Sequence, residues 1–217
     1  ANNITLAGLR AGSVVASGAG ITQTGTLSII GTADLDSTGA MTLAGVTAGT
    51  LAATAGDTLQ LVGVDVTGAA TLRSSAGITL RDVDAGSLSA IAGGPLQVSG
   101  SEVTGAAALQ ASTLLLDGLQ AGSLSATAGN GLEINNSSTT GDATLDAGAG
   151  QLLIATLAAG GDLQASGAGV TQTGSLAVAG DAVLAAGAGN LAMDSASIGG
   201  DLTATGVGIT QGGTLQV

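Results

Sequence analysis

Apolar and polar residues alternate along this chain with a period of two. The residues two positions before each of the anchor residues named below are Gly or Ala, and those two positions after are Ala or Ser. The intervening positions, such as Ser13, Asp34 and Thr50, are mostly polar. This alternation indicates β-strands with one buried face, because a helix would need apolar recurrence at three and four residues. The anchor residues are Val14, Leu35, Leu51, Leu72, Leu88, Leu109, Leu124, Leu145, Leu163, Leu184 and Leu202.

The spacing of these anchors predicts a stack of repeated units. Each step from the first, third, fifth, seventh and ninth anchor to the next is 21 residues, and the other steps are 15 to 18 residues. The repeat is therefore a doublet of roughly 37 residues. A single unit cannot bury its own apolar face, but units stacked about 4.8 Å apart in a parallel ladder can. We predict an all-β fold, a parallel β-helix or β-solenoid of about eleven rungs, in which residues 1–217 form one repetitive segment.

Two local features test this prediction. Further strands are expected at 21–29, 41–43, 58–63, 78–80 and 191–193, separated by Gly-rich corners. The single Pro, Pro95, is expected at a corner or at the start of a strand, where its missing N–H breaks no ladder bond. The apolar run at 112–118 interrupts the pattern, and a short helix is the alternative there.

The composition explains how such a core is filled. The chain has no Phe, Tyr, Trp or Cys, yet 45% of its residues are hydrophobic and 39 are Gly. It is therefore too apolar for a typical disordered segment, and its core must consist of Leu, Val, Ile and Ala. No run of about 18 consecutive apolar residues is present, so we predict no membrane insertion.

Charge and missing residue types exclude several function classes. The net charge of −12, with Arg as the only basic residue type, repels phosphate backbones and anionic lipids, so nucleic acid is not an expected partner. Without His, Cys or Lys, the chain cannot form the usual nucleophilic triads or a phosphate-binding loop with its Lys. We predict no enzymatic activity, no catalytic residues and no cofactor.

The acidic residues are dispersed rather than clustered. Asp34 and Asp36 flank one anchor, and Asp82 and Asp84 bracket Val83; we interpret both pairs as solvated surface rather than as an acid/base dyad. Calcium is the best candidate metal, but the nonapeptide of calcium-binding solenoids is absent, and we predict no metal site. A carbohydrate-binding or carbohydrate-cleaving β-helix remains the alternative function, which an acidic groove would favour.

A third possibility comes from Thr22-Gln23-Thr24, which recurs at 171–173 and partly at 210–212. Rows of Thr-x-Thr on a flat solenoid are typical of ice-binding surfaces. Such a surface needs the motif on successive rungs, and the rungs aligned with it here carry 58–60, 95–97 and 131–133 instead. We therefore attribute the Thr residues to their β-propensity, with ice binding as a less favoured function.

The segments 18–29, 159–193 and 199–217 resemble the repeats of filamentous haemagglutinin-type exoproteins, the large passengers of two-partner secretion. The resemblance covers essentially the whole chain. It implies a right-handed β-helix that is exported through an outer-membrane transporter to the surface of a Gram-negative bacterium. It also implies a role as the shaft of an adhesin in attachment, biofilm formation or effector presentation, with a surface receptor or polysaccharide as partner.

The expected position of this segment is the interior of a longer rod. The Asn-Pro motifs of the family's secretion domain are absent, since Gly94 precedes the only Pro. Repeat-like sequence extends to both ends, with no polar capping unit, so end-to-end self-association is an alternative expectation.

Overall fold

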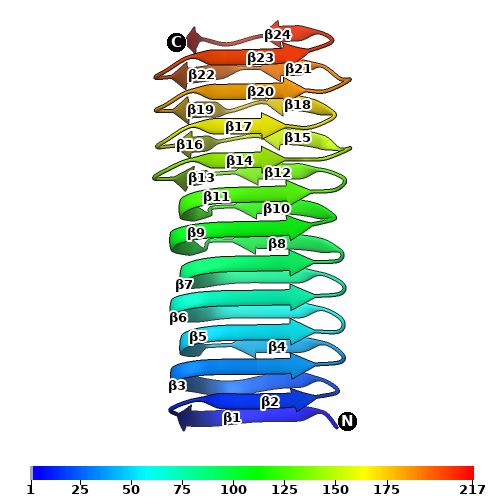
Figure 1. Cartoon of the computed structure of the whole chain (residues 1–217), viewed down its shortest axis with the longest axis vertical. Coiled ribbons are helices and arrows are strands. Elements are labelled where there is room, and N and C mark those ends of the chain that lie inside the picture. Colours follow the sequence, from blue (N-terminus) through cyan, green and yellow to red (C-terminus); the bar gives the residue numbers. More distant parts are fainter. Residues whose placement is uncertain (1) are drawn as a thin grey trace.

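The computed structural model describes residues 2–217 as one continuous 25-stranded sheet that winds into a rod. Every strand pairing is parallel. In Figure 1 the strands in front run from left to right, those behind run from right to left, and the chain climbs from the N-terminus at the bottom. This path is a right-handed coil of about eleven turns, which confirms the predicted β-solenoid.

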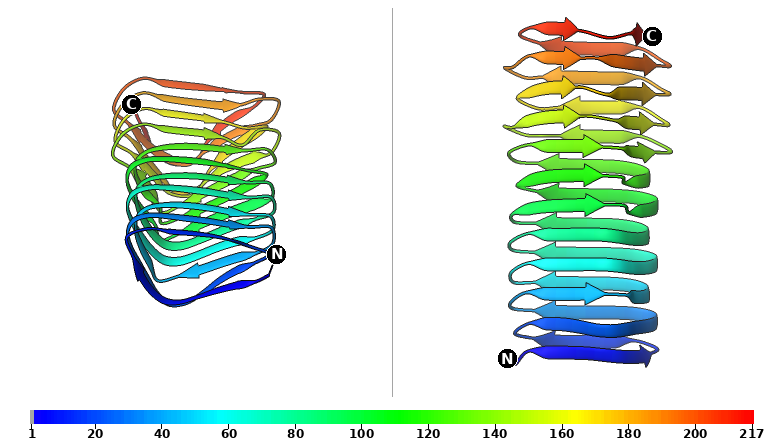
Figure 2. Two further views of the ribbon diagram at one scale, coloured as in Figure 1. Left: turned by 60° about the horizontal axis from the view of Figure 1, so that its bottom comes forward. Right: turned by 180° about the vertical axis from the view of Figure 1, so that it is seen from behind.

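Each turn, or coil, has three sides. In the coil formed by β7 (Ile78–Ala92), the first side is 78–80, the second side is 83–85 and the third side is 88–92. The tilted view on the left of Figure 2 shows these turns stacked upon one another. The remaining strands of the N-terminal coils are β1 (Ile4–Ala11), β2 (Val14–Gly18), β3 (Ile21–Ser37), β4 (Met41–Ala44), β5 (Val46–Ala55), β6 (Leu59–Ser74), β8 (Pro95–Ser99), β9 (Glu102–Ala111), β10 (Thr113–Asp117) and β11 (Gln120–Ala128).

The C-terminal coils are built from shorter strands. The corner between the second and third sides is rounded in the lower part of Figure 1 and pointed in the upper part, where the strands are interrupted. These strands are β12 (Leu132–Asn135), β13 (Ser137–Thr139), β14 (Ala143–Asp146), β15 (Gln151–Ile154), β16 (Leu157–Ala159), β17 (Leu163–Ser166), β18 (Gly169–Gln172), β19 (Ser175–Val178), β20 (Ala182–Ala186), β21 (Leu191–Met193), β22 (Ser195–Ile198), β23 (Leu202–Gly206), β24 (Ile209–Gln211) and β25 (Leu215–Gln216).

The anchors of the third side occupy two neighbouring columns, which corrects the prediction that they stack on one another. Leu88 pairs with Ala70 below and Ala107 above, while Leu109 pairs with Ala90 and Ala126. The Leu88 column contains Val14, Ala33, Leu51, Ala70, Leu88, Ala107, Leu124, Ala143, Leu163, Ala182 and Leu202. The Leu109 column contains Ala16, Leu35, Ala53, Leu72, Ala90, Leu109, Ala126, Leu145, Ala165, Leu184 and Ala204.

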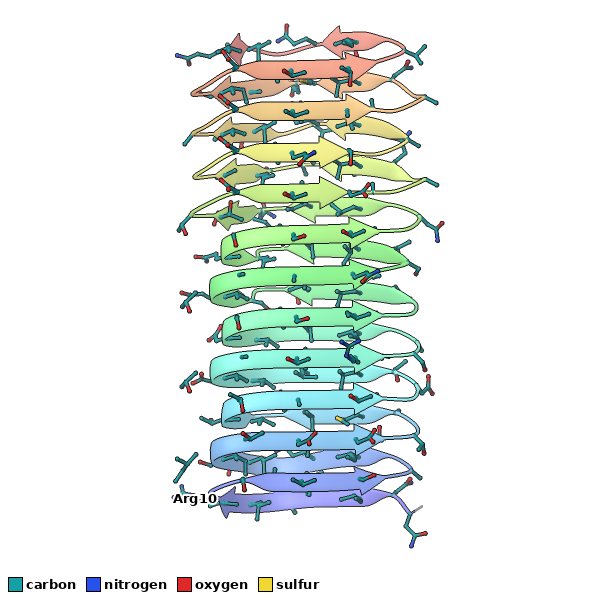
Figure 3. All side chains as sticks on the ribbon, viewed as in Figure 1. Arg10 is labelled. Carbon is teal, nitrogen blue, oxygen red and sulfur yellow. The ribbon has the colours of Figure 1, made fainter. Side chains whose placement is uncertain are left out.

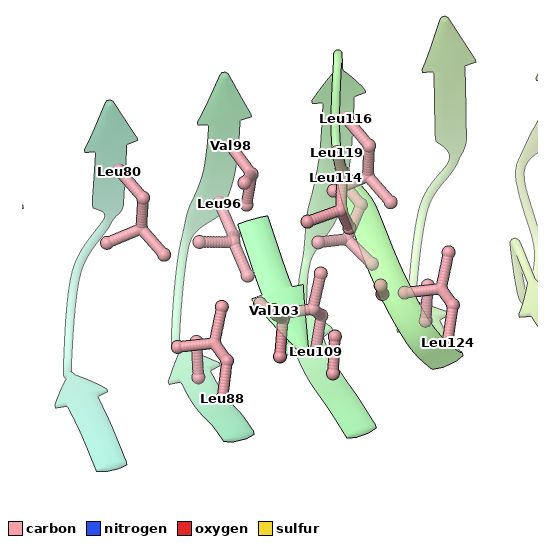
Figure 4. Close-up of a cluster of buried hydrophobic side chains, with 14 of the residues drawn as sticks. Leu80, Leu88, Leu96, Val98, Val103, Leu109, Leu114, Leu116, Leu119 and Leu124 are labelled. Carbon is pink, nitrogen blue, oxygen red and sulfur yellow. The ribbon is translucent and has the colours of Figure 1, made fainter. Parts of the chain in front are cut away.

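Large and small residues therefore alternate both along each column and between the two columns. Figure 4 shows Leu88, Leu109 and Leu124 entering the core from successive coils in this staggered arrangement. Such alternation fills the lumen at constant coil spacing, because each Leu projects beside an Ala. The predicted doublet therefore corresponds to a packing unit of two coils. The anchor spacing alternates between longer and shorter steps because the Leu lies two positions further along the strand in every second coil.

In the coils from Gly8 to Asn136, the corner between the first and second sides contains a residue in the left-handed conformation. Gly63 has φ +60° there, and the stacked corners use Asp82 at +52° and Asn136 at +48°. Asp and Asn are the non-Gly residues that adopt this conformation most readily. The sequence therefore varies at this corner only among residues that tolerate the required backbone.

The local predictions are confirmed. Pro95 begins β8, and the segment 112–118 contains strand β10 rather than a helix. The strands expected at 21–29, 41–43, 78–80 and 191–193 lie within β3, β4, β7 and β21, and the one expected at 58–63 lies within β6 except for Thr58, which precedes it. No helix occurs in the described part of the chain, so none there has the length and apolarity for crossing a membrane.

Candidate functional site

The outward faces carry the polar groups of the rod, and one of them holds a column of acids. Asp65, Asp84 and Glu102 pair in register on the second side of three successive coils. They line a shallow depression of about 260 Å³ together with Thr67 and Thr104. All three acids are exposed, at the parallel-strand spacing of about 4.8 Å. Sequence reasoning missed this column because its members lie 18 to 19 residues apart, in strands that only the register brings together.

The two acid pairs noted in the sequence lie in different parts of the coil. Asp34 and Asp36 are both exposed on the third side, on β3. Asp82 occupies the left-handed corner, while Asp84 lies in the strand that follows and belongs to the acidic column. Asp82 therefore forms a corner and Asp84 belongs to a strand, although both are exposed as expected.

A second ladder of acids replaces backbone pairing at the pointed corners. The Oδ1 atom of Asp142 accepts the N–H of Asp162 at 2.9 Å, Asp162 accepts that of Asp181 at 2.9 Å, and Asp181 accepts that of Asp201 at 2.8 Å. Because these N–H groups bond to side chains, the strand ladder is interrupted there. Each Asp that donates its N–H is preceded by a Gly, and there is no space for a larger residue there. A Cβ at Gly180, which precedes Asp181, would lie 2.0 Å from Asp162 Oδ1.

A further depression lies on the first side. It has a volume of about 390 Å³ and is lined by Pro95, Gln97, Leu115, Glu133 and residues of the adjoining strands. Amides, hydroxyls and aliphatic groups alternate there, so this surface can donate and accept hydrogen bonds but has no aromatic group for stacking. Figure 3 draws the side chains on the ribbon and shows those at the corners projecting outward from both edges of the rod.

The Thr-Gln-Thr motifs have their central residue inside the rod. Gln23 and Gln172 are only 4% and 2% exposed, whereas the flanking Thr24 and Thr173 face outward. The rung alignment predicted from sequence is wrong by two residues. Thr22 pairs with Thr42, which pairs with Gln60, whereas the prediction aligned Thr22 with Thr58. Successive rungs still lack the full motif, since the residues stacked on Thr24 include Ala7.

No set of three or more His, Cys, Asp or Glu residues within 2–217 is arranged to hold a metal ion. The buried polar side chains of the same residues all have hydrogen-bond partners. No orphaned polar atom therefore points into the core toward a missing ligand.

Taken together, the parallel ladder, the two-coil packing unit and the filled lumen define a repeat-containing β-solenoid, a structural repeat protein. A family described as repeats of unknown function (DUF5649) matches residues 1–48 and 141–197. The two matched stretches each contain one buried Gln, Gln23 or Gln172. No match was found among curated proteins or among solved structures.

Proposed function

We propose that this solenoid is the structural shaft of a surface adhesin, exported by two-partner secretion in a Gram-negative bacterium, and not an enzyme. The observation that carries the proposal is the single hydrophobic core cluster, which continues from Ile21 in β3 to Ile198 in β22. A lumen filled by regular Leu and Ala columns supports a stiff spacer, in which any coil can be exchanged for another of the same kind. The resemblance of the repeats to haemagglutinin-type exoproteins supports export and surface display.

Removing one two-coil unit tests the shaft role in cells. Deletion of residues 51–87 joins Thr50 to Leu88, which places Leu88 over Ala33 with the size alternation preserved. If the region is a spacer, cells that display the shortened protein in its native context should attach as well as the wild type, and the rod should be shorter by roughly 10 Å. Loss of attachment with normal surface display would contradict the spacer role.

Export is tested separately from attachment. We expect the protein to reach the cell surface only when its outer-membrane transporter partner is produced, as measured by protease accessibility on intact cells. Surface exposure that persists without any such transporter would contradict two-partner secretion while leaving the shaft role intact.

The acidic column favours a carbohydrate-binding or carbohydrate-cleaving role as the second candidate. The 51–87 deletion removes Asp65 and Asp84, so this role, unlike the shaft role, predicts loss of function in that variant. Asp84→Asn with Glu102→Gln distinguishes the two proposals, because both side chains are exposed and their replacement leaves the lumen unchanged. Binding to immobilised polysaccharides that disappears in this double variant would support the second candidate, and unchanged attachment would support the shaft.

A further inference from the structure

Two buried glutamines in distant coils share two hydrogen bonds, and Gln172 makes a third. Gln172 Oε1 accepts the N–H of Asp194 in the coil above at 2.7 Å, and its Nε2 donates to the carbonyl oxygens of Gly174 and, at 3.1 Å, Ser195. Gln23 Oε1 accepts the N–H of Ala44 at 2.6 Å, and its Nε2 donates to Gly25 O. Each amide thus binds its own corner through one end and the next coil through the other.

These glutamines coincide with a longer corner. Three residues separate Gln172 from Leu176, the next inward position, whereas two residues separate Leu61 from Val64. The same column holds Leu, Ile, Val or Met in the other coils, and each of those corners has two residues. Gln211 also precedes a three-residue corner and donates to Gly213 O. The pattern Gln-x-Gly-Thr/Ser-Leu therefore accompanies every long corner between these two sides in the described coils.

The amide supplies what a longer corner lacks. An extra residue displaces the corner backbone from the regular ladder, and at the second motif the Gln172 amide donates to the displaced carbonyl oxygen of Gly174 while its Oε1 gives Asp194 N–H a second acceptor beside Gln172 O. The Gln side chain carries both a donor and an acceptor and can satisfy the two groups together, whereas Leu can satisfy neither. Conversely, a Gln at a two-residue corner would bury an amide whose partners already pair with each other.

We propose that Gln23 and Gln172 are positioning residues that set the corner length and fix the register of the coil stacked above them. Near-identical coils otherwise offer alternative stackings by a whole coil. A buried amide in an apolar column disfavours those alternatives, because its hydrogen bonds form only with the correct partner coil. This role is separate from the shaft function, since it concerns how the coils find their neighbours.

A double-mutant cycle at the second motif tests the coupling between the amide and the third corner residue. Gln172→Leu alone should lower the melting temperature by roughly 2–10 °C, because it removes the amide's hydrogen bonds to Gly174 O and Ser195 O and leaves Asp194 N–H with only the main-chain oxygen of Gln172 as acceptor. Deletion of Ser175 alone should do the same. Together they produce Val-Thr-Leu-Thr-Gly-Leu, which matches Met-Thr-Leu-Ala-Gly-Val at 41–46, and should recover most of the loss. Additive losses would overturn the proposal.

Two further measurements keep the test decisive if a variant folds poorly. Hydrogen exchange should accelerate at the amide of Asp194 in Gln172→Leu, because that N–H then keeps only one of its two acceptors, while Asp181, whose N–H bonds to Asp162, stays unchanged. In the reverse transfer, Leu61→Gln should destabilise the rod, and insertion of a Thr after Gly63 should then restore it. A rod in which Leu61→Gln is tolerated without the insertion would contradict the assigned role.

Discussion

At the scale of single residues, the core is apolar except where the backbone needs a partner. The buried polar side chains bond chiefly to main-chain groups at corners: Ser137 Oγ accepts the N–H of Leu119 at 3.2 Å and donates to Asn135 O at 2.8 Å. Each such side chain therefore offsets its own burial by satisfying the turn. The full set is Gln23, Ser37, Ser74, Ser101, Ser137, Thr139 and Gln172.

The left-handed corner predicts a specific order of substitution costs. Gly63→Ala should lower the free energy of unfolding by about 1–2 kcal/mol, because φ is +60° while the space around its missing Cβ is open. Gly63→Asn should cost less. Gly12→Ala is the matched control, since that site is equally open but has no positive φ. Far-UV circular dichroism in denaturant is the measurement, and equal costs at both sites would contradict the argument.

The inward and outward positions predict unequal effects of charge. Leu88→Asp places a carboxylate in a site that is 2% exposed and should cost more than about 3 kcal/mol. Asp162→Ala removes only an exposed side chain and one hydrogen bond to Asp181, for about 1 kcal/mol. Similar denaturation midpoints for the two variants would show that the columns are assigned to the wrong face.

At the scale of elements, the two kinds of corner reflect which group accepts the backbone N–H. Strands such as β6 continue through the corner between the second and third sides, where residues such as Ala69 have no side-chain hydrogen-bond acceptor. From Asp142 onward a carboxylate takes the N–H of the next coil, and separate strands such as β16 and β17 result. One residue type per coil thus changes the strand pattern without changing the coil stack.

The Asp ladder predicts strong coupling between Asp162 and Gly180. Gly180→Ala should cost about 1–3 kcal/mol, because its Cβ would overlap Asp162 Oδ1 at 2.0 Å. In the Asp162→Ala background the same substitution should cost much less, since the overlapping atom is gone. Chemical denaturation of the four proteins measures the coupling, and independent effects would mean that the ladder is not closely packed.

At the scale of the whole molecule, the rod is a sequence of coils that must alternate in kind. A coil with Leu in the Leu88 column carries Ala in the Leu109 column, and its neighbours carry the reverse. Because each coil contacts only its neighbours, exchange or removal is governed by the local match of sizes. The number of coils removed therefore matters less than whether it is even.

Deletions of one coil and of two coils should differ in their effect on stability, although both begin directly after Thr50. Removing 51–87 keeps Leu over Ala, whereas removing 51–69 joins Thr50 to Ala70 and places Leu72 over Leu35. The single-coil deletion creates an overpacked layer beside a void, which should cost several kcal/mol locally. We expect the larger deletion to retain the wild-type denaturation midpoint and the smaller one to lose it, and equal midpoints would refute the alternation.

The sequence alone determined that strands with one buried face repeat along the whole chain, because side-chain alternation and small-residue spacing are local properties of a strand. It also placed Pro95 at a corner or a strand start, of which the structure shows the second, and it identified the missing residue types that exclude common catalytic groups. Only the tertiary structure decided which residues stack, since the register depends on corner lengths summed around each coil. For that reason the acidic column, the Asp ladder and the inward position of Gln23 emerged only with the fold: each consists of residues that a full turn of chain separates and the parallel ladder brings to about 4.8 Å.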